Sequence, residues 1–312
     1  MEGIVIKSTG SWYHVETTEG KVIECKLRGQ FRIKGIKATN PIAVGDRVSF
    51  KMMSEKEIGF IHQIHARDNY IIRKATKLSK RSHILASNID QAMLVVTLAL
   101  PRTSTGFIDR FIVTAEAYHI PVCLIFNKID LYNSDMKEDL KEIRRVYNEL
   151  GYKTIEASAT EEINLDEVKD SFKDKRTLIS GHSGVGKSAL INAIAPGMNL
   201  KVGEISDYHE KGKHTTTFAQ MFSLPFGGHI IDTPGIKEFG LLDFDKAEVA
   251  GRFREFRALM HECKYSNCKH MQEPECAIKD AVAADIIAEW RYINYLNIMD
   301  DENMNETYTG SK

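Results

Sequence analysis

Residues 1–70 contain short apolar stretches that alternate with polar positions and are separated by turn residues such as Gly10 and Gly20. An alternation with a period of two predicts β-strands that bury one face. We expect five strands, at residues 3–7, 12–16, 21–27, 47–52 and 59–65. Five short strands around a long central loop are typical of an OB-fold, although an SH3-like barrel also fits this pattern.

The pattern changes near residue 71, where apolar strands begin to alternate with amphipathic helices. We expect strands at residues 90–100, 121–126, 154–157 and 176–180, and helices at residues 107–118, 136–150, 165–172 and 187–194. Such alternation predicts a mostly parallel sheet that is covered by helices on both faces. A basic linker is expected to lead into this domain, formed by Arg73, Lys74, Lys77, Lys80 and Arg81.

From about residue 247 the pattern is helical, with an interruption between Cys263 and Cys276. After Asp300 the chain is polar, and we expect a disordered tail there. A chain of 312 residues is long enough for two or three domains with their own cores. The predicted division is an all-β domain at 1–70, an α/β domain at 71–245 and a helical module with its tail at 246–312.

Charge is distributed unevenly along the chain, although the formal net charge is only −1. Residues 1–85 carry sixteen Lys or Arg against eight Asp or Glu. The central loop of the predicted barrel, residues 28–45, has four basic residues, no acidic one, and Phe31 among them. This balance indicates a polyanionic partner such as RNA, with Phe31 either stacked on a base or packed against the barrel. A solvated surface with excess lysine is the other interpretation.

The sequence gives no indication of membrane insertion or secretion. The apolar run from Ala92 to Leu100 is about half as long as a membrane-spanning helix requires. No basic segment followed by an apolar one begins the chain, so we expect no secretory signal. The chain has five cysteines, three of them clustered, which favours a reducing compartment and a metal site over a disulfide framework. We therefore expect a cytoplasmic protein.

A glycine-rich loop of sequence GHSGVGKS lies between the strand predicted at 176–180 and the helix predicted at 187–194. Such a loop presents backbone amides to phosphate oxygens, and the dipole of the following helix adds to the attraction. Lys187 is expected to bridge the β- and γ-phosphates, while the Ser188 hydroxyl coordinates Mg²⁺. The candidate phosphate-binding residues are Gly181, Ser183, Gly184, Val185, Gly186, Lys187, Ser188 and Ala189.

Two further segments select the base. Asn127, Lys128 and Asp130 follow an apolar strand, and Ser158 and Ala159 follow the next strand. The Asp130 carboxylate can accept hydrogen bonds from two donors of guanine that adenine lacks, so a site built around it should reject ATP. Asn127 and Lys128 would support the side of the site that contains Asp130, and the Ala159 amide would donate a hydrogen bond to guanine O6. An unrelated ATPase is the interpretation to be excluded.

The γ-phosphate and its metal are expected to contact a third group of segments. Asp232 would reach Mg²⁺ through water, and the Gly235 amide would contact the γ-phosphate. Thr216, within three consecutive threonines, would complete the Mg²⁺ shell. The base-reading segments precede the phosphate loop here, whereas an ordinary GTPase begins with that loop. A circular permutation explains the order, because domain termini usually lie close together on the surface.

Four residues with metal-binding side chains lie within fourteen positions: Cys263, Cys268, His270 and Cys276. Three thiolates and one imidazole would give a closed tetrahedral Zn²⁺ site, which is structural because no coordination position remains for water. His261 as the nitrogen ligand is a variant of this interpretation. Three free thiols without a metal are the alternative.

The permuted order, the Lys213–Thr217 and Asp232–Ile236 segments and the Cys/His cluster together resemble the RsgA family of small-ribosomal-subunit biogenesis GTPases. The resemblance covers nearly the whole chain. It implies a circularly permuted P-loop GTPase domain, preceded by an OB-fold barrel and followed by a helical zinc-binding module. Ala189 and Glu275 are minor departures from the family pattern.

The resemblance also implies an activity and partners. Such a protein binds the small (30S) ribosomal subunit and its 16S-type rRNA, assists late maturation, and hydrolyses GTP to GDP when the subunit stimulates it. The implied cofactors are one structural Zn²⁺ and the Mg²⁺ bound with GTP, and we expect a monomer. An RNA-binding assembly factor that uses GTP only as a structural ligand is the alternative function.

Catalysis requires a group other than the glutamine that many GTPases place after the Asp-x-x-Gly motif, because this chain has Ile236 at that position. The resemblance points to His214 as the residue that holds the attacking water, and an imidazole is chemically able to do so. The predicted catalytic residues are therefore His214, Lys187 and Thr216. A solvent-facing loop histidine is the other interpretation of His214.

Overall fold

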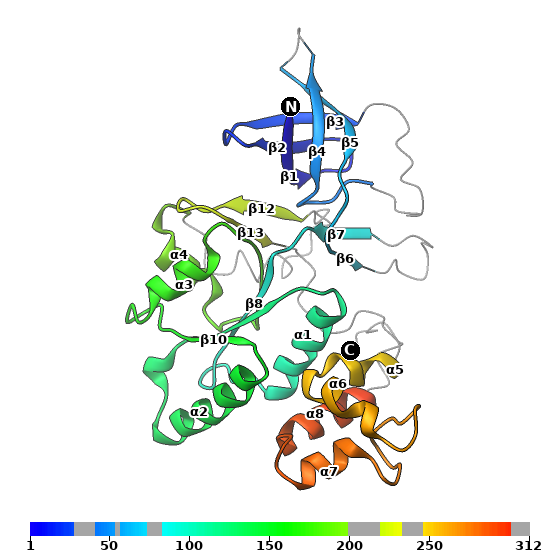
Figure 1. Cartoon of the computed structure of the whole chain (residues 1–312). Helices are drawn as coiled ribbons and strands as arrows, with labels where there is room; N and C mark the ends of the chain where they lie inside the picture. The colour runs from blue at the N-terminus through cyan, green and yellow to red at the C-terminus, as the bar shows by residue number, and fades with distance from the viewer. Residues whose placement is uncertain (28–40, 54–56, 74–82, 199–218, 233–245, 301–312) are drawn as a thin grey trace, which may run out of the picture.

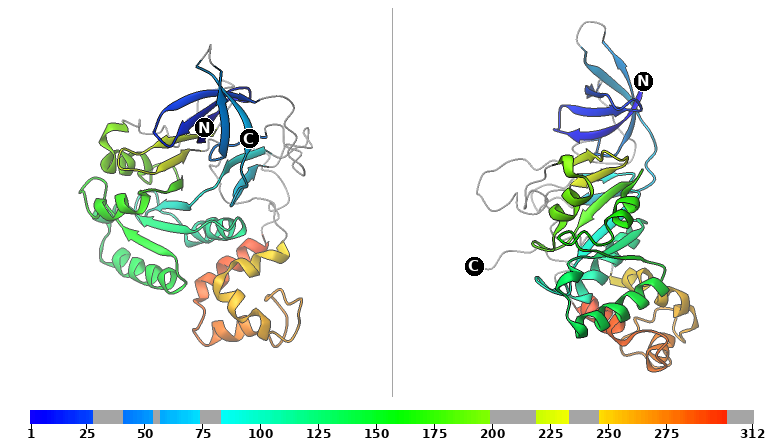
Figure 2. Two further views of the ribbon diagram at one scale, coloured as in Figure 1. Left: turned by 45° about the horizontal axis from the view of Figure 1, so that its top comes forward. Right: turned by 90° about the vertical axis from the view of Figure 1, so that its left-hand side faces the viewer.

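The computed structural model describes residues 1–27, 41–53, 57–73, 83–198, 219–232 and 246–300. A small barrel lies at one end of the molecule, an α/β domain in the middle and a helical module at the other end (Figures 1 and 2). None of the helices in these ranges combines the length and the apolar character needed to span a bilayer.

The N-terminal barrel has the five strands that the alternation predicts: β1 (Glu2–Ser8), β2 (Tyr13–Thr17), β3 (Val22–Leu27), β4 (Arg47–Met52) and β5 (Gly59–Ile64). Their order is β1-β2-β3-β5-β4, and an antiparallel pairing of β1 with β4 closes the barrel. Val5, Tyr13 and Phe50 are almost fully buried inside it, as expected for inward-facing positions. The OB-fold is confirmed, and the SH3-like alternative is not.

In the described part of the α/β domain, the central sheet has six strands in the order β10-β9-β8-β11-β13-β12. Their bounds are β8 (Gln91–Val96), β9 (Val122–Phe126), β10 (Lys153–Glu156), β11 (Arg176–Ser180), β12 (Gln220–Ser223) and β13 (His229–Asp232). Neighbouring strands are parallel except for β12, which pairs antiparallel with β13. The predicted parallel sheet is therefore confirmed.

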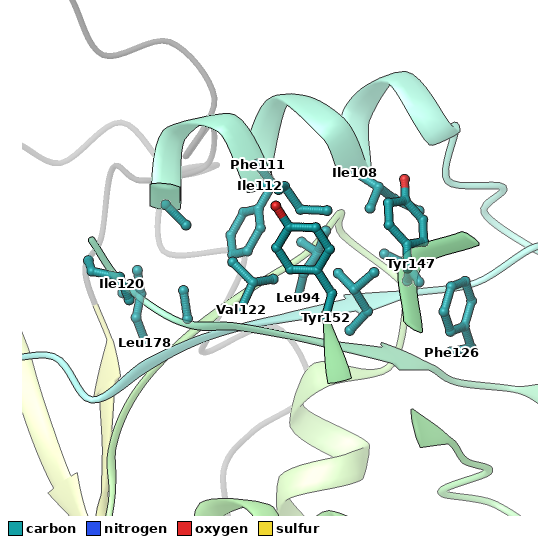
Figure 3. Close-up of a cluster of buried hydrophobic side chains, with 14 of the residues drawn as sticks. Leu94, Ile108, Phe111, Ile112, Ile120, Val122, Phe126, Tyr147, Tyr152 and Leu178 are labelled. Carbon is teal, nitrogen blue, oxygen red and sulfur yellow. The ribbon is translucent and has the colours of Figure 1, made fainter. Parts of the chain in front are cut away.

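Helices cover both faces of this sheet: α1 (Thr105–Ala117), α2 (Ser134–Glu149), α3 (Leu165–Phe172) and α4 (Lys187–Ile194). Alternate residues of one strand enter opposite cores. Leu94 of β8 packs with α1 residues such as Phe111 and Ile112 (Figure 3), whereas Val95 packs with α4 residues such as Leu190. Because both faces of the sheet are covered, the central strands β8 and β9 are buried along their whole length, as in other parallel sheets.

Strand β8 is shorter than predicted, since the apolar run that begins at Ala92 leaves the sheet after Val96. The chain turns there because Thr97 O accepts a hydrogen bond from Thr103 N at 2.8 Å, and Thr97 N donates to Thr103 Oγ1 at 3.3 Å. Residues 97–103 therefore form a loop at the edge of the sheet.

The predicted basic linker is flanked by two short strands that the sequence pattern did not reveal. β6 (Tyr70–Arg73) pairs antiparallel with β7 (His83–Ser87). Arg73 thus ends a strand, while Lys74, Lys77, Lys80 and Arg81 lie outside the described residues. The linker prediction was wrong at its first residue, because Arg73 pairs with His83 across these two strands.

The barrel is joined to the α/β domain by polar contacts. Buried Asp46 accepts two hydrogen bonds of 2.6 Å from Arg67 and one of 2.6 Å from the Ser87 hydroxyl. Glu16 of β2 lies 2.6 Å from the His229 ring of β13. A bridge between β1 and β12 makes one eleven-stranded sheet of the barrel and the central domain.

The C-terminal module is built from α5 (Lys246–Val249), α6 (Arg254–Leu259), α7 (Ala277–Ala283) and α8 (Glu289–Asp300). Arg291 of α8 is 1 % exposed and forms ion pairs with Asp109 of α1 and Glu255 of α6. Asp109 also accepts hydrogen bonds from Tyr147 at 2.7 Å and Asn294 at 2.6 Å. Burial raises the pKa of Asp109 against the opposing effect of Arg291. The buried charge of Arg291 is tolerated because it is paired. Since its partner Asp109 belongs to α1, this network fixes the module to α1.

Candidate functional site

The predicted ligand-binding segments meet at one edge of the central sheet. Asn127 follows β9, Ala157 follows β10, Gly181 follows β11, and Asp232 is the last residue of β13. The carboxyl ends of parallel strands lie on the same edge, which is where open α/β sheets bind ligands. Segments that are up to about a hundred positions apart in the chain therefore form one site.

The phosphate loop has a backbone that only glycine adopts readily. Gly181 has a φ of +143°, and a Cβ there would lie 2.3 Å from Val95 O. Gly186 has a φ of +97°, and its Cβ would lie 2.4 Å from Asn127 Nδ2. The loop therefore approaches two neighbouring strands closely and cannot carry side chains at these positions.

Lys187 lies across the phosphate loop that precedes it. Its Nζ donates to Gly181 O at 2.7 Å and to His182 O at 2.8 Å. Ser188 is buried in the first turn of α4, where the helix dipole attracts anions. The His182 ring packs against Phe107 of α1, with 3.9 Å between ring centroids, and burial lowers the pKa of that histidine.

The base-reading segment is hydrogen-bonded directly to the phosphate loop. Asn127 Nδ2 donates to Val185 O at 2.8 Å, and Asn127 Oδ1 accepts from Ala159 N at 3.3 Å. Lys128 Nζ donates to Gly184 O and to Leu100 O, both at 2.7 Å. Asn127 is 1 % exposed, so its bonds are shielded from water. Two side chains thus set the spacing between the two ends of the site.

The orientation of Asp130 is set by Ser158. The Ser158 hydroxyl donates to Asp130 Oδ1 at 2.5 Å and accepts from Glu161 N at 3.1 Å. Ser158 is fully buried, whereas Asp130 is exposed. The buried Ser158 hydroxyl therefore orients the Asp130 carboxylate while the carboxylate itself faces solvent. This arrangement leaves it able to accept hydrogen bonds from a bound base.

Three predicted residues lie outside the described part of the chain: His214, Thr216 and Gly235. Asp232 is described through its backbone, which pairs with Gln220 of β12. Since β13 is the neighbour of β11, this strand end lies beside the phosphate loop. Among the described residues, the site brings together the predicted base-reading segments and the phosphate loop, in which Ser183 and Ala189 are exposed.

Two features of the site were missed from the sequence. The loop of residues 97–103 contributes Leu100 O to Lys128, and Tyr132 contacts both this loop and Asn127. The threonines at 97 and 103 on either side of Pro101 could have indicated a turn, since proline cannot continue a strand ladder. Nothing in the sequence alone marks the Tyr132 hydroxyl.

The predicted metal ligands form a compact cluster. The ligand atoms of Cys263, Cys268, His270 and Cys276 all lie within 4.8 Å of one another. His270 Nδ1 is 3.5 Å from Cys263 Sγ and 3.4 Å from Cys276 Sγ. The side chain of His261 is 72 % exposed and pairs with Glu262, so it is not the nitrogen of this cluster.

The donor set fits a divalent cation that prefers sulfur and nitrogen. Burial raises the pKa of Cys268 to about 12, and the neighbouring thiols add to this effect. Three thiolates so close together therefore need a cation to stabilise them. Burial lowers the pKa of His270, which keeps the imidazole neutral and able to act as a ligand.

The loop that carries the cluster is held by its surroundings. Two hydroxyls of α8 donate to its backbone: Tyr292 to His270 O at 2.7 Å and Tyr295 to Lys269 O at 2.6 Å. Glu273 accepts from three backbone amides of the loop, at 2.9–3.1 Å, and these bonds lower its pKa to about 2. Outer contacts of this kind orient the ligands of metal sites.

A phosphate loop in the centre of a parallel sheet, joined to an Asn-Lys-x-Asp segment that precedes it in the chain, defines a circularly permuted GTPase. Comparison with known proteins makes this specific. A family model described as RsgA GTPase matches residues 64–242, and one described as RsgA N-terminal domain matches residues 2–61. The chain belongs to the RsgA GTPase family.

Individual relatives agree. The chain is 53 % identical over 302 residues to "Small ribosomal subunit biogenesis GTPase RsgA 2" of Bacteroides thetaiotaomicron and 55 % identical to its counterpart in Phocaeicola vulgatus, covering 97 % of each chain in both cases. The solved structure of YjeQ from Thermotoga maritima superposes with a TM-score of 0.78 at 36 % identity, covering 96 % of both chains. YloQ, "a circularly permuted GTPase", gives 0.75 at 29 % identity over 98 % of this chain and 96 % of that one.

Replacing Gly186 by alanine should weaken GDP binding about 10- to 100-fold, because strain at a positive φ and the clash with Asn127 cost about 1–3 kcal/mol. Gly197→Ala is the matched control, since no described heavy atom lies within 4 Å of a Cβ built there. Titration calorimetry with GDP measures both variants. Equal affinity in the two would show that the contact between the two segments does not shape the site.

Proposed function

We propose that this protein hydrolyses GTP to GDP and phosphate under the control of the small ribosomal subunit, and assists the maturation of that subunit. The observation that carries the nucleotide part is the direct hydrogen bonding of Asn127 and Lys128 to the phosphate loop. The ribosomal part is supported by the names of relatives that align over nearly the whole chain.

In this proposal the described residues have distinct roles at the nucleotide. Asp130 accepts hydrogen bonds from guanine, and Ser158 orients Asp130. The Ala159 amide donates to the base oxygen. Asn127 and Lys128 keep these base-binding residues at a fixed distance from the phosphates. The phosphates are bound by the loop residues Gly181, Ser183, Gly184, Val185, Gly186, Lys187, Ser188 and Ala189. Lys187 supplies positive charge where the phosphates bind.

Ser188, Thr216 and Asp232 would hold Mg²⁺. When bound, this ion neutralises the charge that develops on the phosphate oxygens. The Gly235 amide would contact the γ-phosphate, so that its segment responds to hydrolysis. Because Ile236 cannot orient water, we assign that task to His214, which also lies close to Thr216 in the sequence.

The barrel is the proposed contact with rRNA of the small subunit. Residues 1–85, which include the barrel, carry an excess of Lys and Arg over Asp and Glu that matches a polyanionic partner. In the described part of the barrel, Lys26 Nζ lies 4.0 Å from the ring centroid of Trp12, which places a cation and an aromatic face side by side. Such pairs are typical of surfaces that bind single-stranded nucleic acid. None of the five cysteines forms a disulfide, which supports action in the cytoplasm.

The cluster of Cys263, Cys268, His270 and Cys276 is proposed to hold one structural Zn²⁺. The donor set of three sulfurs and one nitrogen is the observation that supports it. The ion would tie the loop between α6 and α7 together, and α8 would connect that loop to α1 through Arg291.

GTP turnover with purified small ribosomal subunits tests the function. The isolated protein should hydrolyse GTP slowly, and small subunits should accelerate it about 10³- to 10⁵-fold, as when a missing catalytic group is brought into place. His214→Ala should lose most of this stimulation but keep its GDP affinity. His261→Ala, a change at an exposed histidine, should keep both. Binding to the subunit without accelerated turnover would contradict the control of hydrolysis by the subunit and favour the assembly factor that uses GTP as a structural ligand.

Zinc content tests the metal proposal. The purified protein should contain about one Zn²⁺ per chain. Cys276→Ser should remove most of it and lower the midpoint of thermal unfolding, because the loop between α6 and α7 loses its cross-link. Cys123→Ala is the control, since Cys123 is equally buried but lies in strand β9. Elemental analysis that found the same zinc content in both variants would rule out the assigned ligands.

A further inference from the structure

We propose that Tyr132 is a positioning residue for guanine recognition. Its buried hydroxyl joins the base-reading segment to the loop of residues 97–103, and so sets how well Asp130 meets the base. This inference rests on the proposed role of Asp130 and adds a residue outside the motifs that bind nucleotide.

Tyr132 follows the short 3-10 helix η1 (Ile129–Leu131) that contains Asp130, and it is 4 % exposed. Its hydroxyl accepts a hydrogen bond from Leu98 N at 2.8 Å and lies 3.0 Å from Asn127 O, to which it donates. Thr97 Oγ1 lies 3.4 Å away. One hydroxyl therefore connects the carboxyl ends of β8 and β9 at the edge where the nucleotide site is built.

The connected loop continues to the phosphate loop. Leu100 O accepts from Lys128 Nζ, which also donates to Gly184 O. Pro101 lies against the same glycine, since a Cβ on Gly184 would come within 3.4 Å of the proline Cδ. The loop of residues 97–103 is thus bonded to the base-reading segment at two points. The Tyr132 hydroxyl holds the start of the loop at Leu98, and Lys128 holds it at Leu100.

The Tyr132 hydroxyl is buried, so its loss should affect the neighbouring backbone groups strongly. Leu98 N and Asn127 O lie where water cannot readily replace a lost partner, so removing the hydroxyl carries the cost of unsatisfied buried groups. The aromatic ring of Tyr132 packs in the core formed with α1 and α2, and a phenylalanine at this position preserves that packing. The change therefore acts on the alignment of residues 127–130 rather than on the core.

The test uses full-length, zinc-loaded protein with Tyr132→Phe and, as a matched control, Tyr152→Phe. Tyr152 is also buried in this core, but its hydroxyl donates to Glu116 at 3.2 Å, away from the nucleotide loops. Dissociation constants for GDP and IDP are measured by calorimetry. Inosine lacks the 2-amino group of guanine, so the ratio of the IDP constant to the GDP constant reports the contact made by Asp130.

We expect Tyr132→Phe to raise the GDP dissociation constant about tenfold and to lower the IDP-to-GDP ratio, because a misaligned carboxylate gains less from the 2-amino group. Tyr152→Phe should leave the ratio unchanged. A general loss of stability does not alter this ratio. A Tyr132→Phe protein with the wild-type affinity and ratio would overturn the proposal.

Two other outcomes are also decisive. Equal affinity of the wild-type protein for GDP and IDP would show that Asp130 does not read the 2-amino group. The proposed function would then fail, and that result is distinct from a failure of the Tyr132 proposal alone. Should Tyr132→Phe not fold, hydrogen exchange of the Leu98 amide in the wild type replaces it. Saturation with GDP should slow that exchange about tenfold relative to the barrel strands, and no change would overturn the proposal.

Discussion

The nucleotide site depends on one short connection, in which Asn127 and Lys128 donate to the carbonyl oxygens of Val185 and Gly184. In its bound conformation a nucleotide has a defined distance between its base and its phosphates, so a protein that binds both must hold two loops at a matching distance. Here the two loops are bonded to each other. Order that exists before binding reduces the entropy cost of binding. The close approach explains why Gly186 has no side chain, since a Cβ there would collide with Asn127.

A parallel sheet allows this connection to form whatever the order of its segments along the chain. β11, which leads into the phosphate loop, lies between β8 and β13. The base-reading loops therefore lie to one side of it and Asp232 to the other. In the permuted order the helical module follows Asp232, and the module is also fixed to α1 by the buried pair of Arg291 and Asp109. The same helix contacts the phosphate loop through Phe107 and His182, so α1 adjoins both the nucleotide site and the module.

Local features of the sequence predicted most of the fold and the spatial grouping of the candidate site. The phosphate loop, the Asn-Lys-x-Asp segment and the Cys/His cluster are each contiguous or nearly so, and the alternation of apolar and polar positions placed their flanking strands. Contacts between distant residues could not be predicted in this way. Arg291 and Asp109 are 182 positions apart, and no pattern in the sequence pairs them. Strands β6 and β7, which pair with each other across the predicted basic linker, were not recognised, and the apolar run that begins at Ala92 concealed the turn at Thr97.

The most direct measurement of the central claim is a competition titration of the full-length protein, in which unlabelled GDP or ADP displaces a fluorescent GDP analogue. If the bonded loops form one site that reads guanine and binds the phosphates together, GDP should compete at concentrations at least about 10³-fold lower than ADP, because adenine lacks the donors that Asp130 requires. Equal competition by the two nucleotides would contradict the account.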